Sequence, residues 1–390
     1  MKKILSILMS LVLLLSVVAV FAPALTVEAE EVEGPEKFEE GEDTGMGAVP
    51  LDEIKVGFVH ITDPSDQGYT YNHNRGTEGM MEELGLREDQ ILNKFNTPET
   101  AEAATAIRDL AESGCHIIFA TSFGFEEYML EVAADYPDIE FCHATGFRAS
   151  SSELKNVHNY FGAIYQARYL SGIVAGLKTE TNVLGYVTAM PFAECISGFT
   201  GFYLGAKSVN PDVTMLVQYT NSWHDPTAEA QVAQSLIDLG ADVIGQHCDS
   251  TAPATAAEAA GVWHIGYNSD MREAAPDASM TSAIWDWSQY LIYAVNQRSA
   301  GAAIAVDWSK GLAEHVVLLS EYNEDLMPEG AEEAVQEAYD RIVSGDWDVF
   351  TGPLVDIDGN VVVEEGDTFI EPQSAPSWEY ILEGITIVGE

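Results

Sequence analysis

The chain has 390 residues, of which 47% are hydrophobic, and 63 acidic against 17 basic side chains give it a formal net charge of -46. This charge argues against nucleic acid as a partner, because phosphate binding needs Lys and Arg. It also argues against an anionic ligand, since the sequence shows no local cluster of Arg side chains that would offset the negative charge. The charge could attract cations, but a solvated surface adapted to high salt, where screening is strong, explains it more simply.

The amino-terminal residues have the pattern of an export signal. Two lysines precede an apolar run from Ile4 to about Leu25, and small residues follow. We therefore expect a signal peptide over residues 1–29 and a secreted or cell-surface protein, with no cysteine in the first hundred residues for lipid attachment. An uncleaved anchor is the alternative, because the run is nearly long enough to span a bilayer.

Residues 30–48 are acidic and poor in apolar side chains, which is typical of a disordered linker. The folded part is expected to begin near Val49. About 340 residues then remain. Because a single hydrophobic core usually supports fewer residues than this, two lobes are expected.

From Ile54 onward, short apolar runs typical of buried strands alternate with helical stretches. The first series has predicted strands at residues 54–61, 91–95, 116–121, 140–143 and 157–161, and helices at 74–84, 99–113 and 125–136. After a helix at 167–177, the second series has strands at 183–188, 214–219, 242–247, 263–267 and 279–285, and helices at 192–208, 226–239, 253–260 and 288–304. This alternation predicts parallel sheets covered by helices on both faces. Two similar units favour a hinged clamp over a single large doubly wound domain.

Aromatic and polar side chains follow several predicted strands at the carboxyl ends, where parallel sheets bind ligands. The candidate binding residues are Tyr69, Tyr71, Asn74, Phe123, Trp223, Asp249, Asp270 and Trp285. Stacking on an aromatic side chain contributes about 1–3 kcal/mol per base, so Trp223 facing Tyr69 or Tyr71 would select a flat ligand. Asp249 and Asn74 could then read the polar edge of its ring.

Each of these residues also has a plainer interpretation. Trp223 could pack one lobe against the other, and Trp285 could belong to the core beneath the following helix. Asp249 could cap a helix, and Asp270 could bind a sugar diol or stabilise a turn.

Catalytic and metal-binding patterns are missing from the sequence. It contains no GxSxG, GxGxxG or P-loop lysine motif. The four cysteines form no CxxC pair, and zinc spacing is absent. We expect no enzyme activity, no cofactor and no metal, and we favour buried free thiols over a disulfide.

Several segments resemble the basic membrane protein family, whose members are substrate-binding proteins of ABC importers and include purine nucleoside receptors. They are DQGYTYNHNRG, ATSFGF, NYFGAIYQARYLSGIVAG, NSWHDPTAEA, GADVIGQHCDS and IGYNSDM, within residues 54 to about 309. Thr70 stands where the nucleoside-receptor branch has an asparagine, and Asn74 stands where a related purine-base branch commonly has an aspartate. The ligand-reading carboxylate of the family matches Asp249 or Asp270.

The resemblance implies a two-lobed periplasmic-binding-protein fold of type I, each lobe a doubly wound parallel sheet. Lobe 1 would comprise residues 49–165 plus 286–310, and lobe 2 residues 166–285 plus 311–390. It also implies a monomer that binds a purine, adenine-like first and a nucleoside second, and delivers it to an ABC permease. A sensor for a membrane signalling protein and an exported purine nucleoside hydrolase remain the alternatives.

Overall fold

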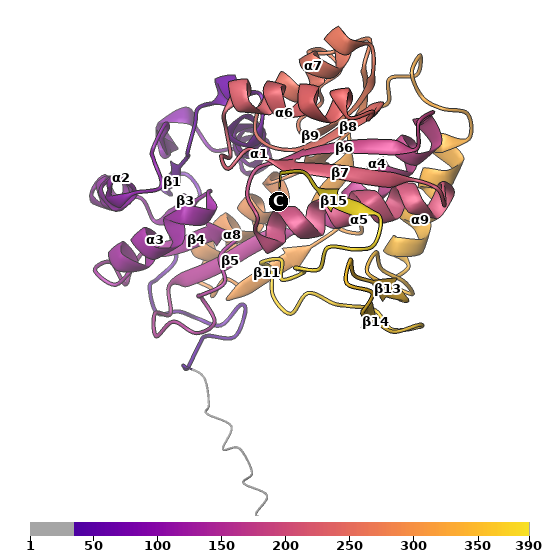
Figure 1. The fold of residues 1–390 in the computed structure, drawn as a ribbon. Helices are drawn as coiled ribbons and strands as arrows, with labels where there is room; N and C mark the ends of the chain where they lie inside the picture. The colour runs from indigo at the N-terminus through magenta and orange to yellow at the C-terminus, as the bar shows by residue number, and fades with distance from the viewer. Residues whose placement is uncertain (1–34, 390) are drawn as a thin grey trace, which may run out of the picture. The chain divides into compact units, whose positions relative to one another are not determined.

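The computed structural model describes residues 35–389, so the predicted signal peptide 1–29 and residues 30–34 of the acidic segment lie outside the described residues. Two large sheets dominate the described part (Figure 1). No helix within it is long and apolar enough to cross a membrane.

The first sheet has six strands, all parallel, in the order β11-β5-β4-β3-β1-β2. These strands are β1 (Val56–Val59), β2 (Ile91–Lys94), β3 (Ile117–Ala120), β4 (Glu140–Ala144), β5 (Val157–Gly162) and β11 (Asp307–Lys310). Helices α1 (Tyr69–Leu84) and α8 (Ser288–Ala300) cover one face, and α2 (Ala101–Glu112) and α3 (Glu126–Ala133) cover the other. Alternate strand residues supply the two cores: Phe58 packs with the first pair of helices and Val59 with the second.

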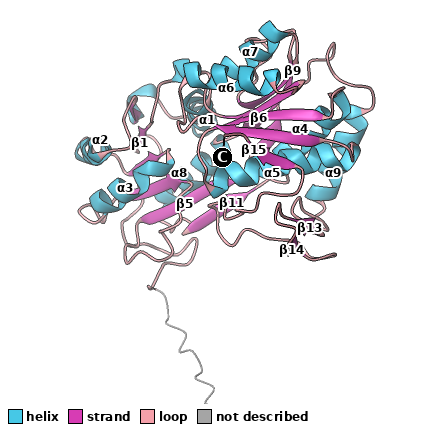
Figure 2. Ribbon diagram, viewed as in Figure 1, coloured by secondary structure: helices cyan, strands magenta, loops and turns pink. Residues whose placement is uncertain are grey.

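The second sheet has seven strands in the order β12-β10-β9-β8-β6-β7-β15, and only β12 is antiparallel to its neighbour. These strands are β6 (Val183–Thr188), β7 (Thr214–Tyr219), β8 (Val243–His247), β9 (Trp263–Asn268), β10 (Ser279–Trp285), β12 (Val317–Leu319) and β15 (Ile385–Ile387). One face is covered by α4 (Ile164–Lys178), α5 (Ala193–Val209) and α9 (Ala331–Val343), and the other by α6 (Pro226–Asp238) and α7 (Ala252–Ala260) (Figure 2). The small sheet β13 (Leu354–Val355) and β14 (Val361–Val363) follows α9.

Helices α4 and α5 pack unusually closely. A Cβ atom placed on Gly172 would lie 2.0 Å from the carbonyl oxygen of Phe202, and one on Gly205 would lie 1.9 Å from that of Tyr169. Both positions therefore require glycine, and the absence of side chains lets the two backbones touch.

The chain passes between the two sheets after β5, after β10 and after β11. This arrangement confirms the predicted two-lobed α/β fold with parallel sheets. The lobe boundaries given above stay a prediction. All four cysteines are buried and free, as the sequence favours.

Two predicted helix boundaries are wrong by four residues or more. Helix α1 begins at Tyr69 rather than at Asn74, because the Asp66 carboxylate accepts hydrogen bonds from the backbone amides of Gly68, Thr70 and Tyr71 at 2.9–3.0 Å. These are the amides that a helix start leaves without partners. Helix α8 ends at Ala300 rather than near residue 304, because Gly301 adopts a φ of 72°.

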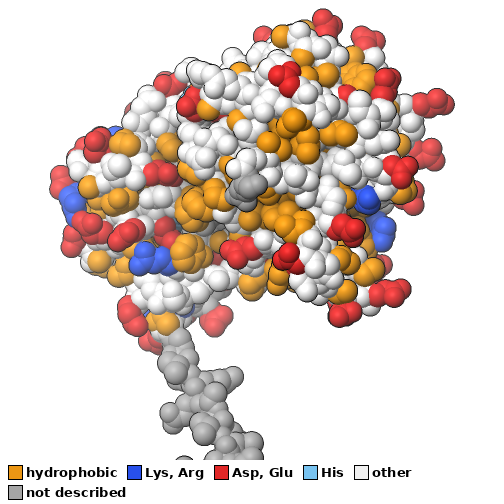
Figure 3. Space-filling view, in the orientation of Figure 1, with side chains coloured by type: hydrophobic (Ala, Val, Ile, Leu, Met, Phe, Trp, Pro, Cys, Tyr) orange, Lys and Arg blue, Asp and Glu red, His pale blue; other side chains and the backbone are white. Residues whose placement is uncertain are grey.

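The prediction of a disordered acidic linker is wrong for residues 35–48. The amide of Gly41 donates to the carbonyl of Ala303 at 2.9 Å, and the amide of Ala303 donates to the carbonyl of Glu42 at 2.7 Å. The guanidinium of Arg298 also donates to the carbonyl of Gly47 at 2.9 Å. The backbone thus pairs with the segment after α8 while acidic side chains face solvent. Figure 3 shows that acidic side chains are also common at the surface elsewhere, with many Asp and Glu and few Lys and Arg over the visible face.

Candidate functional site

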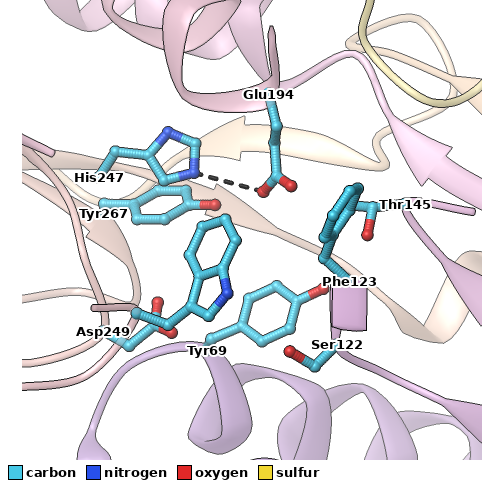
Figure 4. A pocket seen from close by; sticks show the side chains of 9 residues that line it. Tyr69, Ser122, Phe123, Thr145, Glu194, His247, Asp249 and Tyr267 are labelled. Carbon is cyan, nitrogen blue, oxygen red and sulfur yellow. Dashed lines mark ion pairs between the residues drawn. The ribbon is translucent and has the colours of Figure 1, made fainter. Parts of the chain in front are cut away.

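A small pocket, with a cavity volume of about 20 Å³, lies where the carboxyl ends of the two sheets meet (Figure 4). This volume holds about one water molecule, so the walls must move apart before a larger ligand can enter. The first lobe lines the pocket with Tyr69, Ser122, Phe123 and Thr145, and the second with Glu194, Trp223, His247, Asp249 and Tyr267. Most of these side chains stand at the ends of strands or in the loops and first helical turns that follow them. The pocket therefore occupies the position where parallel sheets bind ligands.

Four of the eight sequence-predicted residues line this pocket: Tyr69, Phe123, Trp223 and Asp249. Tyr71, Asp270 and Trp285 instead line a separate cavity beside the start of α1. Asn74 lies on the outer side of α1, where its amide donates to Glu78 at 2.9 Å. Tyr69 and Tyr71 face different cavities because both lie in α1, which begins earlier than predicted. Successive side chains of a helix point about 100° apart, so residues two positions apart face different directions.

Tyr69 is held in place by aromatic neighbours. Its ring lies edge-on to His73, with 4.5 Å between centroids, and edge-on to Trp287 at 6.1 Å. His73 in turn stacks on Trp287 at 4.4 Å. Because these neighbours are buried, the orientation of Tyr69 is fixed before any ligand arrives, which reduces the entropy cost of binding.

Trp223 reaches the pocket from the loop after β7. Its carbonyl oxygen accepts a hydrogen bond from the amide of Asp249 at 2.9 Å, which ties this loop to the one after β8. The nearest rings, Phe192 and His247, have centroids 6.3 and 6.4 Å away and are tilted against it. The indole is thus positioned by the backbone rather than by a stacked protein ring.

Asp249 is a buried carboxyl at the pocket wall. It accepts a hydrogen bond from the side-chain amide of Asn268 at 2.9 Å. Burial, followed by the nearby carboxylates of Asp66 and Glu229, raises its pKa well above 3.8. The cap position of α7 belongs to Thr251, so Asp249 is not the helix cap that its sequence position also allowed.

Asp270 has a different environment. Both of its oxygens accept hydrogen bonds from the guanidinium of Arg272, at 2.6–3.0 Å. Of the two aspartates that the sequence could not separate, Asp249 is the one that lines the pocket.

Glu194 is a pocket residue that sequence reasoning missed. It lies in the first turn of α5, its side chain is 11% exposed, and its Oε1 is 3.4 Å from Nε2 of His247. Burial raises its pKa to about 8, against an opposing effect of Arg168. Burial and Arg168 lower the pKa of His247 well below 6.5. Its position could have identified Glu194 as a candidate, because it lies at the helix start that follows β6, and the other candidates also follow strands.

Tyr267 completes the far wall of the pocket. The guanidinium of Arg168 lies over its ring, with 3.9 Å between the guanidinium carbon and the ring centroid. Of the eight sequence-predicted residues, only Asp270 comes from the loop after β9, whereas Tyr267 at the strand end faces the pocket.

The two lobes touch at the rim of the pocket. The hydroxyl of Ser269 donates to the carbonyl of Gln67 at 2.5 Å, and the side-chain amide of Asn72 donates to the carbonyl of Trp285 at 3.2 Å. A Cβ atom on Gly68 would lie 2.3 Å from the carbonyl oxygen of Asp249. The two lobes are therefore in direct contact at this rim.

The groups that line the pocket are suited to binding a flat ligand. Aromatic side chains offer flat faces, and carboxyl groups with raised pKa values offer hydrogen bonds with little net charge. This combination suits a planar, polar and uncharged ligand. Among residues 35–389, no group of three or more His, Cys, Asp or Glu side chains is arranged to hold a metal ion.

Comparison with known proteins agrees with this geometry. A family model described as ABC transporter substrate-binding protein, PnrA-like, matches residues 54–344. The chain is 35% identical to a purine-binding protein of Brucella abortus, over 83% of this chain and 90% of that protein. It is 32% identical to a putative ABC transporter glucose-binding protein of Haloferax volcanii, over 84% of this chain and 82% of that protein.

The fold itself recurs in solved structures. A solute-binding protein of an ABC transporter system from Conexibacter woesei superposes with a TM-score of 0.62 at 22% identity, covering 76% of this chain and 98% of that one. At this identity the likeness concerns the fold alone.

Proposed function

Because this chain belongs to the PnrA-like family of ABC transporter substrate-binding proteins, we propose that it binds a purine base, adenine or a close relative, between its lobes. The observation that carries the proposal is the pocket formed by Tyr69, Phe123, Trp223 and Asp249. Its aromatic faces suit a flat heterocycle, because every base offers a π-face for stacking. The similarity to a protein named as purine-binding supports the same ligand class.

The polar groups of the pocket support an uncharged base in particular. Asp249 and Glu194 can exchange hydrogen bonds with ring nitrogens and amino groups, and a protonated carboxyl both donates and accepts. A purine that lacks a matching group would leave a buried partner unsatisfied, at a cost of about 1–3 kcal/mol. Glucose, suggested by the name of the Haloferax volcanii relative, carries hydroxyls for these carboxyls but has no planar ring to stack.

A purine nucleoside is the second candidate, and a wider cavity favours it. This mouth cavity has a volume of about 510 Å³, and it shares Phe123, Thr145 and Glu194 with the pocket. A base in the pocket could therefore carry a substituent into the mouth cavity.

We further propose that the protein works outside the cytoplasm as a monomer, without a catalytic role, and presents its ligand to the permease of an ABC importer. Closure of the lobes around the ligand would produce the form that the permease recognises. Contacts such as that between Ser269 and Gln67 exist only when the lobes meet, so a ligand touching both lobes favours this state.

Calorimetric titration of the purified, ligand-free protein with adenine tests the proposal. We expect binding by the wild type, and an affinity lowered about tenfold or more in Trp223→Ala, because one stacking face is lost. Trp263→Ala is the matched control, since Trp263 begins β9 at the amino end of the strand, away from the pocket. Binding of glucose without adenine, or an unchanged affinity in Trp223→Ala, would contradict the proposal.

A further inference from the structure

The carboxyl-terminal segment reaches the ligand site from outside the family-matched part of the chain. The family model ends at residue 344. The segment after it adds β15 beside β7 in the second sheet (yellow in Figure 1). Before β15, residues 370–379 form a loop that lines the mouth cavity and is called the mouth loop below.

The mouth loop is fixed to both lobes. The amide and hydroxyl of Ser374 donate to the carboxylate of Asp307 on β11, in the first sheet, at 2.8 and 2.6 Å. Trp378 is fully buried and stacks on Phe350 with 4.6 Å between centroids. Phe350 in turn lies against Tyr165 of α4, which belongs to the second lobe. These anchors hold the loop in one position at the mouth of the site.

The loop is also held internally. The carboxylate of Glu371 accepts hydrogen bonds from the amide and the hydroxyl of Ser377, both at 2.7 Å. The residues between them, Gln373 included, are therefore presented by a closed and rigid turn. Rigid presentation is what a specific ligand contact requires.

Gln373 carries a polar atom that lacks a partner. It lines the mouth cavity, and its Oε1 is buried without a hydrogen bond to any other group of the protein. A buried polar atom left unpaired is unfavourable, and native structures usually pair such atoms with protein, water or ligand. The anchors on both sides of Gln373 hold its backbone beside the mouth cavity.

We propose that Gln373 contacts the ligand directly and hydrogen-bonds a polar, hydroxyl-bearing substituent of a purine whose base lies in the pocket. Gln373 does not line the pocket itself, so a bare base there would not reach it. A substituent can do so by passing Phe123, Thr145 and Glu194, which border both cavities. The mouth loop thus adds a contact for a substituted purine that a bare base does not make. This inference rests on the proposed purine-binding function.

The test compares two probes on one variant. Adenine and adenosine, which differ only by the hydroxyl-bearing ribose, are titrated calorimetrically into the ligand-free wild type and into Gln373→Ala. We expect the variant to bind adenosine about threefold to tenfold more weakly, as for one lost hydrogen bond, and adenine unchanged. Gln336→Ala is the matched control, because Gln336 is an exposed glutamine on α9. Gln373→Met keeps the length of the side chain and gives the same test should the alanine variant not fold.

The other outcomes overturn the inference. If the wild type binds adenine but not adenosine, the mouth does not take the substituent. If both affinities fall together, Gln373 supports the fold and does not touch the ligand, and if neither changes it makes no contact. If the wild type binds neither purine, the proposed function fails first, and this inference fails with it.

Discussion

Replacement of Glu194 by glutamine tests whether a nearly buried carboxyl in the pocket stays protonated in the folded protein. Burial raises the pKa of Glu194 from its ordinary 4.5 to about 8. Between these two values the unfolded chain has released its proton while the folded chain retains it. The free energy of unfolding therefore falls as the pH rises through this interval, and the contribution of Glu194 is constant outside it.

The size of the effect follows from that interval. At 1.36 kcal/mol per pH unit, the interval costs the wild type up to about 5 kcal/mol, of which about 3 kcal/mol is already lost at pH 7. Glutamine has nearly the same shape and no titration. We therefore expect Glu194→Gln to be more stable than the wild type at pH 7 and above, and to approach it near pH 4.5.

Urea unfolding followed by tryptophan fluorescence, at constant ionic strength and several pH values, measures this difference. Other titrating groups, such as His247 and Asp249, remain in both proteins, so most of their effects cancel in the comparison. Glu127→Gln is the control, because it removes one negative charge from an exposed position on α3. A stability difference between Glu194→Gln and the wild type that does not vary with pH would refute the reasoning.

Three further predictions concern binding and packing. Asp249→Ala should weaken adenine binding about tenfold in calorimetry, because the carboxyl that can donate and accept at the pocket wall is lost, and an unchanged affinity would remove Asp249 from the site. Gly68→Ala places a methyl group 2.3 Å from the carbonyl oxygen of Asp249, so small-angle scattering with ligand should give a larger radius of gyration than for the wild type. An equal radius would show that the rim tolerates the methyl group. Gly205→Ala brings its methyl group 1.9 Å from the Tyr169 carbonyl and should destabilise the protein by about 1–3 kcal/mol in urea unfolding, whereas wild-type stability would mean that α4 and α5 can separate freely.

The sequence predicted the elements well because strand burial and helix periodicity are local properties. The predictions were wrong where a segment's structure depends on a partner distant in the sequence or on a capping side chain. The acidic segment up to residue 48 looks disordered by composition, yet its backbone pairs with residues 301–303. The start of α1 moved to Tyr69 because of the Asp66 carboxylate, a single capping side chain that the apolar pattern does not reveal.

The candidate site was predicted in part. Tyr69, Phe123, Trp223 and Asp249 meet in one pocket because each follows a strand at the same edge of its sheet. Tyr71 was misplaced by the rotation of a helix that the sequence began too late.

What the sequence alone determined is the alternation of strands and helices, the strand-end positions of the aromatic side chains, and the resemblance to a solute-binding family. The first two follow from burial patterns that each segment shows by itself, and the resemblance rests on motifs within single segments. The tertiary structure decided which strand ends face one another, since strand order in the sheets differs from order in the chain. It also brought Glu194 and the distant Gln373 to one cavity beside the proposed ligand site. Their roles depend on closure of the lobes and on the anchoring of the mouth loop by Asp307 and Phe350, and local sequence carries no signal of either.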